Sequence, residues 1–68
     1  MGQVEQPGDV GRVWYALQRE DGQRERGYWY FATMLEARVM RDRLLDDPAT
    51  TEAAIEAKHA DTWLEYPT

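Results

Sequence analysis

Apolar and polar residues alternate along two stretches in the first half of the chain. The first stretch runs from Arg12 to Glu20, and the second runs from Gly27 to Thr33. A period of two is typical of a β-strand, because successive side chains of a strand point to opposite faces. The pattern therefore predicts two neighbouring strands, each with apolar side chains on both faces.

The residues between these stretches predict a hairpin. Asp21 and Gly22 tolerate the positive φ angles of a tight hairpin turn. A two-residue turn would pair Leu17 with Arg26, whereas a four-residue loop would pair Leu17 with Tyr28. We favour the longer loop because it sets aromatic residues opposite one another. Both registers predict one face with Val13, Tyr15, Leu17, Tyr28 and Tyr30, and another with Trp14, Ala16, Trp29 and Phe31.

The stretch after the hairpin predicts a helix. Thr33, followed three positions later by Glu36, is typical of a capping box, and Pro48 marks the end of the helix. Leu35 and Val39 share an outward side. Apolar residues that recur with helical spacing lie on the opposite side, which is expected to face the core. They are Met34, Ala37, Met40, Leu44 and Leu45.

The last third of the chain predicts a second, acidic helix. Asp47 and Pro48 suit its N-cap and first position, or a cap at Thr50 or Thr51 starts it one turn later, and EAAIEAKHA is rich in helix formers. The final DTWLEYPT forms either a third strand beside the hairpin or a tail held by Trp63.

These elements predict an α+β fold. An antiparallel β-hairpin, with or without a third C-terminal strand, packs on one or two helices. Residues 1–11 mix Gly, Pro and polar side chains and are predicted to form a flexible tail, and residues 12–68 form a single small domain.

Composition narrows the chemistry that this fold can carry. The 68 residues include no Cys and no Ser, and His59 is the only histidine. Disulfides, Cys and His zinc sites, and Ser or Cys nucleophiles therefore lack their side chains. We expect no catalytic activity, no cofactor and no metal. No apolar run reaches the roughly 18 residues of a membrane span, so a cytoplasmic protein with no membrane partner is predicted.

Charge is unevenly distributed along a chain whose formal net charge is −5. Residues 12–43 carry seven Arg and five acidic residues, whereas residues 44–68 carry six acidic residues and one Lys. Proteins meet their partners through such local fields. An acidic face that docks on a basic partner is therefore predicted, and its candidate residues are Asp46, Asp47, Glu52 and Glu56.

Apolar side chains suggest a second mode of protein binding. A domain of this size buries only about 60% of its unfolded surface, so both faces of an aromatic hairpin are difficult to cover. Exposed aromatic and apolar patches mark interfaces. The candidate residues for binding a partner, or a second copy of this chain, are Trp14, Trp29, Phe31, Leu35 and Val39.

Nucleic-acid binding is the alternative. Arg19, Arg24 and Arg26 flank the aromatic hairpin and suit contacts to phosphates, while rings suit stacking on bases. Glu20 and Glu25 offset part of this positive field. Nucleic acid is therefore the less favoured partner.

Short motifs bear on that alternative. The runs VWY, DGQR and FATMLEA, between Val13 and Leu45, resemble the strand, turn and helix entry of the N-terminal arm-binding modules of phage tyrosine integrases. Such modules lay a sheet against DNA. The resemblance implies a small ββα module with DNA contacts through Trp14, Arg19, Arg24 and Arg26.

In size, acidity and layout, the chain also resembles the small accessory inhibitors of phages and mobile elements, such as anti-CRISPR proteins. This is a likeness of type and transfers no motif residue. The function that we predict is that of a non-enzymatic protein-binding module, a phage-type inhibitor that occludes a basic site, such as one that binds nucleic acid, on a host or phage protein.

Overall fold

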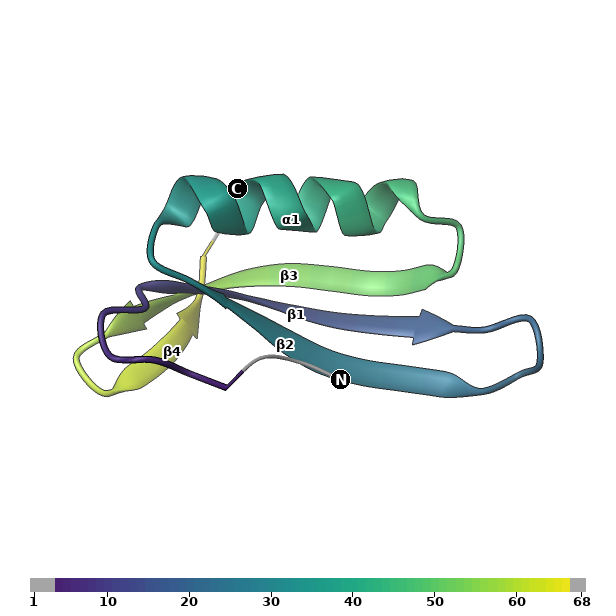
Figure 1. Cartoon of the computed structure of the whole chain (residues 1–68), viewed down its shortest axis with the longest axis horizontal. Coiled ribbons are helices and arrows are strands. Elements are labelled where there is room, and N and C mark those ends of the chain that lie inside the picture. Colours follow the sequence, from purple (N-terminus) through teal and green to yellow (C-terminus); the bar gives the residue numbers. More distant parts are fainter. Residues whose placement is uncertain (1–3, 67–68) are drawn as a thin grey trace.

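The computed structural model describes residues 4–66 as one helix packed on one face of a four-stranded antiparallel sheet (Figure 1). The elements follow in the order β1 (Gly11–Gln18), β2 (Arg24–Phe31), α1 (Met34–Asp46), β3 (Thr50–His59) and β4 (Thr62–Glu65). The strand order across the sheet is β2-β1-β3-β4. The predicted α+β fold, with an antiparallel hairpin packed on a helix, is confirmed.

The hairpin turn at Asp21 and Gly22 is confirmed, but both predicted registers are wrong. The N–H of Gly22 donates to the carbonyl of Arg19 at 2.9 Å, and the N–H of Arg19 donates to the carbonyl of Gln23 at 2.7 Å. Gly22 has a φ of 86°, in the left-handed region that favours glycine. The loop therefore has three residues, 20–22, and closes with a glycine bulge.

This odd loop length reverses the predicted faces of β2. Two-residue and four-residue loops share a parity, whereas a three-residue loop shifts the pairing by one residue and turns every side chain of the second strand over. Trp14 pairs with Tyr28, and Tyr15 pairs with Gly27. Trp29 and Phe31 therefore share the helix-covered face with Val13 and Tyr15, while Tyr28 and Tyr30 share the opposite face with Trp14 and Ala16.

The predicted second helix is wrong, because its residues form the strand β3. β3 lies between β1 and β4: its residues up to Ala57 pair with β1, and its last four residues pair with β4. Ala53, Ile55 and Ala57 point toward α1, and Glu52 and Glu56 point away. Burial of this alternating pattern outweighs the helix propensity of Ala and Glu, which is a weak preference per residue.

α1 begins at its predicted cap. The Thr33 hydroxyl accepts a hydrogen bond from the N–H of Glu36 at 3.2 Å and donates to the Glu36 carboxylate at 3.0 Å. Leu35 and Val39 are exposed, as predicted. Leu45 is also exposed, contrary to its predicted place in the core, because α1 turns it away from the sheet in its last turn.

The core lies between α1 and the two central strands. Val13 of β1, Ala37 of α1 and Ile55 of β3 are at most 2% exposed and contact one another. Around them pack half-buried residues from β2 and α1, namely Phe31, Met34, Met40 and Leu44. Ala37 has a small side chain, which lets α1 lie close to the sheet.

The two ends of the described chain meet at one edge of the sheet. The final stretch forms β4, which pairs with β3 rather than with the hairpin. The residues before β1 approach the same edge, because the Glu5 carboxylate accepts hydrogen bonds from the Lys58 ammonium at 2.6 Å and from the Trp63 indole at 3.2 Å. Residues 1–3 of the predicted tail lie outside the described residues, and its last residue, Gly11, is buried at the start of β1.

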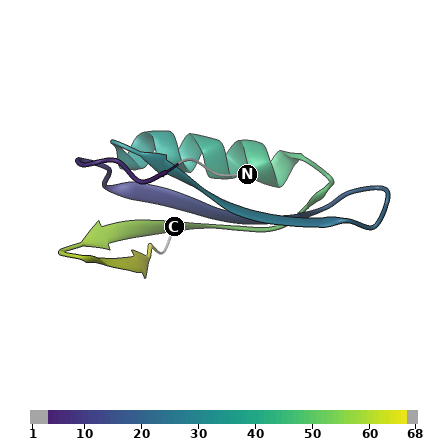
Figure 2. The same ribbon diagram turned by 60° about the horizontal axis from the view of Figure 1, so that its bottom comes forward.

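α1 covers only one side of the sheet (Figure 2). We call the other side the open face. The turn of the β1–β2 hairpin projects beyond the end of α1 (Figure 1). Within residues 4–66, α1 is too short and too polar to cross a membrane.

Candidate functional site

The open face divides into two halves, and one half is held together by contacts of its own. The Arg12 guanidinium lies 4.3 Å from the ring centre of Tyr28 and 4.9 Å from that of Trp63, and its Nε donates to the Glu56 carboxylate at 2.5 Å. Tyr30 packs edge-on against Trp63, with ring centres 5.8 Å apart. We call these five residues the Arg12 cluster.

The charges of the Arg12 cluster are matched within it. Burial disfavours the charged guanidinium, but hydrogen bonds with Glu56 and Tyr30 outweigh that effect and raise the pKa of Arg12. Cation–π contacts with two rings add to the attraction. Because its two charged groups, Arg12 and Glu56, are paired with each other, this half of the open face is structural.

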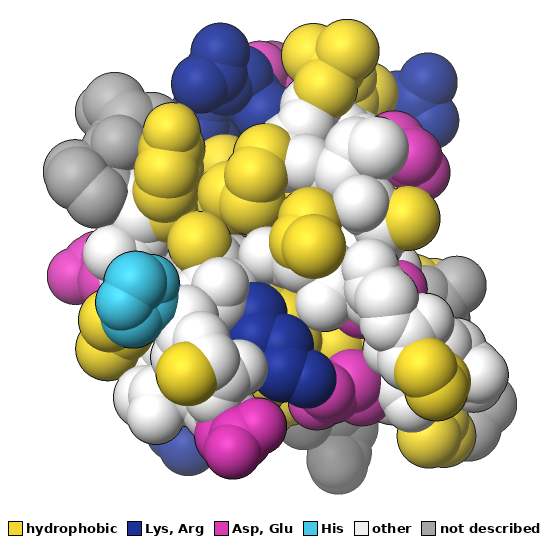
Figure 3. All heavy atoms as spheres, turned by 90° about the vertical axis from the view of Figure 1, so that its left-hand side faces the viewer, with side chains coloured by type: hydrophobic (Ala, Val, Ile, Leu, Met, Phe, Trp, Pro, Cys, Tyr) yellow, Lys and Arg dark blue, Asp and Glu magenta, His cyan; other side chains and the backbone are white. Residues whose placement is uncertain are grey.

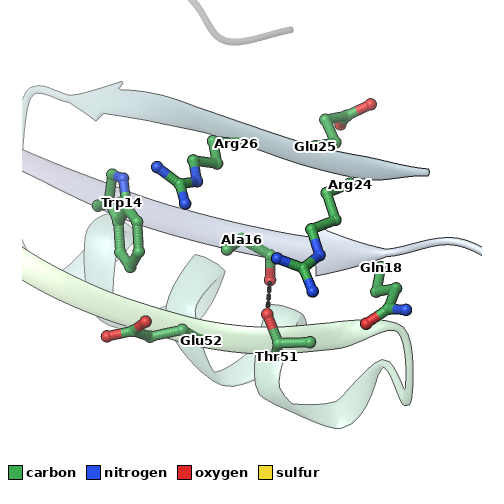
Figure 4. Close-up of a pocket in the computed structure, with 8 residues that line it drawn as sticks. All are labelled: Trp14, Ala16, Gln18, Arg24, Glu25, Arg26, Thr51 and Glu52. Atoms are coloured by element: carbon green, nitrogen blue, oxygen red, sulfur yellow. Dashed lines mark hydrogen bonds between the residues drawn. The ribbon is translucent and has the colours of Figure 1, made fainter. Parts of the chain in front are cut away.

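The other half of the open face contains a shallow depression (Figure 4). Arg24 extends from β2 toward Ala16 on β1, Arg26 extends from β2 toward Trp14, and Glu52 lies on β3 on the opposite side (Figure 4). The depression has a volume of about 280 Å³. Its lining comprises Trp14, Ala16, Gln18, Arg24, Glu25, Arg26, Thr51 and Glu52.

The three candidate arginines do not share one site. Arg24 and Arg26 are exposed and form no ion pair with another residue of the range 4–66. Arg19 instead pairs with Glu25 at 2.5 Å beside the hairpin turn. That ion pair lowers the pKa of Glu25. Of these three arginines, Arg24 and Arg26 are the ones whose guanidinium groups lack an ion pair within the described residues and face a ligand on the open face.

The outer edge of β2 is the longest unpaired backbone in the sheet. β2 has eight residues and, among residues 4–66, pairs with β1 alone. The bond between Arg19 and Gln23 fixes which positions of β2 turn their backbone groups toward β1, because those positions alternate along an antiparallel strand. The alternate residues of β2 turn their N–H and C=O groups outward, away from β1. These residues are Arg24, Arg26, Tyr28 and Tyr30.

An apolar groove lies beside this edge on the helix-covered side. It has a volume of about 320 Å³ and lies between β2 and the exposed flank of α1, where Leu35 is 70% exposed and Val39 is 44% exposed. Its lining comprises Phe31, Leu35, Glu36, Val39, Met40 and Arg43. Figure 3 looks onto the end of the molecule where α1 begins, and hydrophobic side chains gather over its upper half.

The remaining aromatic candidates occupy different environments. Trp14 stands on the open face in the depression (Figure 4). Trp29 lies on the helix-covered face and stacks on Tyr15, with ring centres 6.4 Å apart. Phe31 packs against the core and also lines the apolar groove. The structure therefore brings Phe31, Leu35 and Val39 together and separates them from Trp14.

The four candidate acidic residues are not on one helix. Asp46 and Asp47 lie at the C-terminal end of α1, and the N–H of Asp47 closes the helix by donating to the carbonyl of Leu44 at 3.1 Å. Glu52 and Glu56 point from β3 to the open face, where Glu56 pairs with Arg12. The structure thus divides this set between two sides of the sheet.

The edge of β2 is a candidate site that no sequence pattern predicted. A strand has a free edge only if no other strand pairs with that side, so the edge depends on the order of strands in the sheet. That order could not be predicted, because the residues of β3 were predicted to form a helix. His59 is exposed, and residues 4–66 hold no cluster of three or more acidic, His or Cys side chains that could bind a metal ion.

Comparison with known proteins adds no relative: no family model, no curated protein and no solved structure matches this chain. The resemblances to integrase arm-binding modules and to phage inhibitors stay predictions.

Proposed function

We propose that this chain is a protein-binding module that pairs an extended segment of its partner with the outer edge of β2. The observation that carries the proposal is the row of outward N–H and C=O groups on Arg24, Arg26, Tyr28 and Tyr30. Strand addition to such an edge is a recurring mode of peptide recognition, in which backbone hydrogen bonds supply affinity.

The two edges of the sheet differ in the protection that they carry. Natural proteins protect edges with short strands, charged side chains, Pro or bulges. β4, at one edge, has only four residues and pairs with the last four residues of β3, so the first half of β3 is the only other open stretch on that side of the described sheet. β2, at the other, has eight residues and no Pro. Charged side chains protect only its first half, Arg24–Arg26, whereas its second half, Tyr28–Phe31, is aromatic. An edge of this length with an aromatic half is expected to pair with another chain.

The surroundings of the edge define the partner segment. Its side chains alternate between the two faces, as in any strand. Those on the helix-covered face approach the apolar groove beside Phe31 and Leu35, so apolar residues suit them. Those on the open face approach Arg24 and Arg26, so acidic or aromatic residues suit them.

The test uses proline to remove one outward donor. Arg26→Pro deletes an N–H that points away from β1, so the hairpin ladder stays intact. Peptides selected from a random display library for binding to the chain are expected to bind Arg26→Ala and to lose binding to Arg26→Pro. Glu20→Pro is the matched control, because it places proline at a favourable turn position of the same hairpin, away from the edge.

If the selected peptides bind all three variants equally, and their chemical-shift changes lie away from β2, strand addition is not the binding mode. Inhibition of the partner, which the sequence suggested, stays a prediction beyond this proposal.

The depression on the open face favours a second candidate function, the binding of single-stranded nucleic acid. Trp14 offers a stacking surface, and Arg24 and Arg26 offer unpaired guanidinium groups beside it. Arg24→Glu combined with Arg26→Glu is then expected to abolish binding to a fluorescent oligonucleotide, and affinity is expected to fall steeply with salt. Affinity that does not depend on salt would exclude this candidate.

A further inference from the structure

We propose that the segment that pairs with β2 is β2 of a second copy of this chain, antiparallel to the first and centred on Gly27. The inference rests on the proposed function, because it names the partner of the same edge. The sequence of β2 and the direction in which each of its residues points favour this partner.

In one register, the outward-pointing residues of β2 match the outward-pointing residues of β2 in a second copy. In a symmetric antiparallel pair centred on Gly27, Arg24 lies opposite Tyr30 of the second copy, and Arg26 lies opposite Tyr28. All four are outward-pointing residues, so each such pair can exchange two backbone hydrogen bonds. The charged half of one strand therefore meets the aromatic half of the other.

The neighbouring registers are less favourable. Centring the pair on Arg26 sets two like charges directly opposite each other, which is destabilising. Centring it on Tyr28 leaves Arg24 opposite Ala32, beyond the end of β2. The register centred on Gly27 is the one that uses all four outward residues and places no like charges opposite each other.

This pairing gives the two unpaired arginines a partner. Each guanidinium that lacks an ion pair within residues 4–66 would lie beside a tyrosine ring of the second copy. Arg12 already makes the same type of contact with Tyr28 inside one chain, 4.3 Å from the ring centre. At the centre, Gly27 presents no side chain where two Cα atoms approach to about 4.5 Å.

The symmetry sets the shape of the assembly. A two-fold axis perpendicular to the sheet joins the edges into a continuous eight-stranded sheet with both helices on the same face. The two open faces would then form one surface. Because eight residues of strand are fewer than the roughly 20 to 30 residues per side of a stable interface, we expect a dissociation constant in the micromolar range.

Sedimentation velocity over a range of concentrations tests the inference. The wild-type chain is expected to form a concentration-dependent dimer. Arg26→Pro is expected to raise the dissociation constant about tenfold or more, equivalent to ~1.4 kcal/mol, while Glu20→Pro leaves it unchanged. Circular dichroism checks that each variant is folded.

A distance measurement tests the register without altering the edge donors. The chain has no cysteine, so Gln23→Cys accepts a single spin label. In the proposed register, the two labelled positions lie eight residues apart along the paired strands, about 27 Å at ~3.4 Å per residue. A register centred on Tyr28 would separate them by about 34 Å.

The outcomes separate this inference from the proposed function. A wild-type monomer whose selected peptides still need the edge of β2 overturns the second copy and leaves strand addition intact. A dimer that Arg26→Pro does not weaken, with labels outside the expected distance, overturns the second copy as the partner of this edge. Peptide binding that is also insensitive to Arg26→Pro overturns the proposed function as well.

Discussion

Single residues set how closely β1 and β2 approach each other. The Tyr15 ring lies across Gly27, so a Cβ at position 27 would be 2.6 Å from the Tyr15 hydroxyl oxygen. Tyr15 is only 3% exposed and stacks on Trp29, which limits its freedom to move aside. Glycine at position 27 is therefore required by the packing of the neighbouring strand.

We expect Gly27→Ala to destabilise the fold by about 1–3 kcal/mol, the usual cost of forcing extra atoms into a packed region. Urea unfolding measures the change. In a Tyr15→Phe background the cost should be smaller, because the nearest clashing atom is absent. An equal cost in both backgrounds would show that the clash is not with the Tyr15 hydroxyl.

Arg12 contacts most of the other residues of the Arg12 cluster and holds them together. Its side chain is 17% exposed and that of Glu56 is 23% exposed, so removal of either leaves a largely covered charge unpaired. We expect Arg12→Ala to lower the free energy of unfolding by about 1.5–3 kcal/mol. Arg12→Lys should recover part of this loss, because an ammonium keeps the charge but not the planar guanidinium. Urea unfolding of both variants checks the order.

At the scale of elements, the entry to α1 depends on one hydroxyl. Thr33→Ala removes the acceptor for the N–H of Glu36 and is expected to cost about 1 kcal/mol of stability. Thr33→Ser keeps the hydroxyl and serves as the control. Thermal and urea unfolding should rank the serine variant close to the wild type, and a serine variant as unstable as the alanine variant would contradict the capping role.

Elements with a strong local signal could be predicted from the sequence. The capping residues of α1, its outward residues Leu35 and Val39, and the turn at Gly22 all depend on neighbours in the chain. β3 could not be predicted as easily, because Ala and Glu favour a helix in isolation. The pattern that indicates a strand is the alternation of Ala53, Ile55 and Ala57 with residues of the open face. This pattern outweighs helix propensity only when β1 is present to pair with β3.

The candidate sites, too, could be predicted where they depend on residues that are close in the chain. The apolar groove includes Phe31, Leu35 and Val39, which the sequence marked as candidates. The paired faces of the hairpin could not be predicted, because they depend on whether the loop has an odd or an even number of residues. The edge of β2 required the full strand order, which no local pattern contains.

At the scale of the whole molecule, the ends of the described chain are joined by Glu5. Hydrogen bonds from Lys58 and from the Trp63 indole lower the pKa of Glu5 from its usual 4.5. Because the folded pKa lies below the unfolded value, this contact stabilises the fold above about pH 4.5 and is lost as the pH falls through the folded pKa.

We therefore expect the indole N–H resonance of Trp63 to shift as the pH falls below about 4.5, as Glu5 becomes protonated. Nuclear magnetic resonance of the labelled protein measures this titration. Glu5→Gln should abolish the titration, since an amide does not ionise in this range. A resonance that titrates identically in the variant would assign the shift to another group.

The three-residue loop of the hairpin also constrains how this protein can vary in length. One residue added at 20–22 would exchange the side chains of β2 between the two faces of the sheet. Trp29 would then lie on the open face, and Tyr28 and Tyr30 would lie on the helix-covered face. Two added residues would restore the arrangement. Relatives of this chain are therefore expected to differ at this loop in steps of two residues, and a single-codon insertion there should be among the least tolerated changes in the gene.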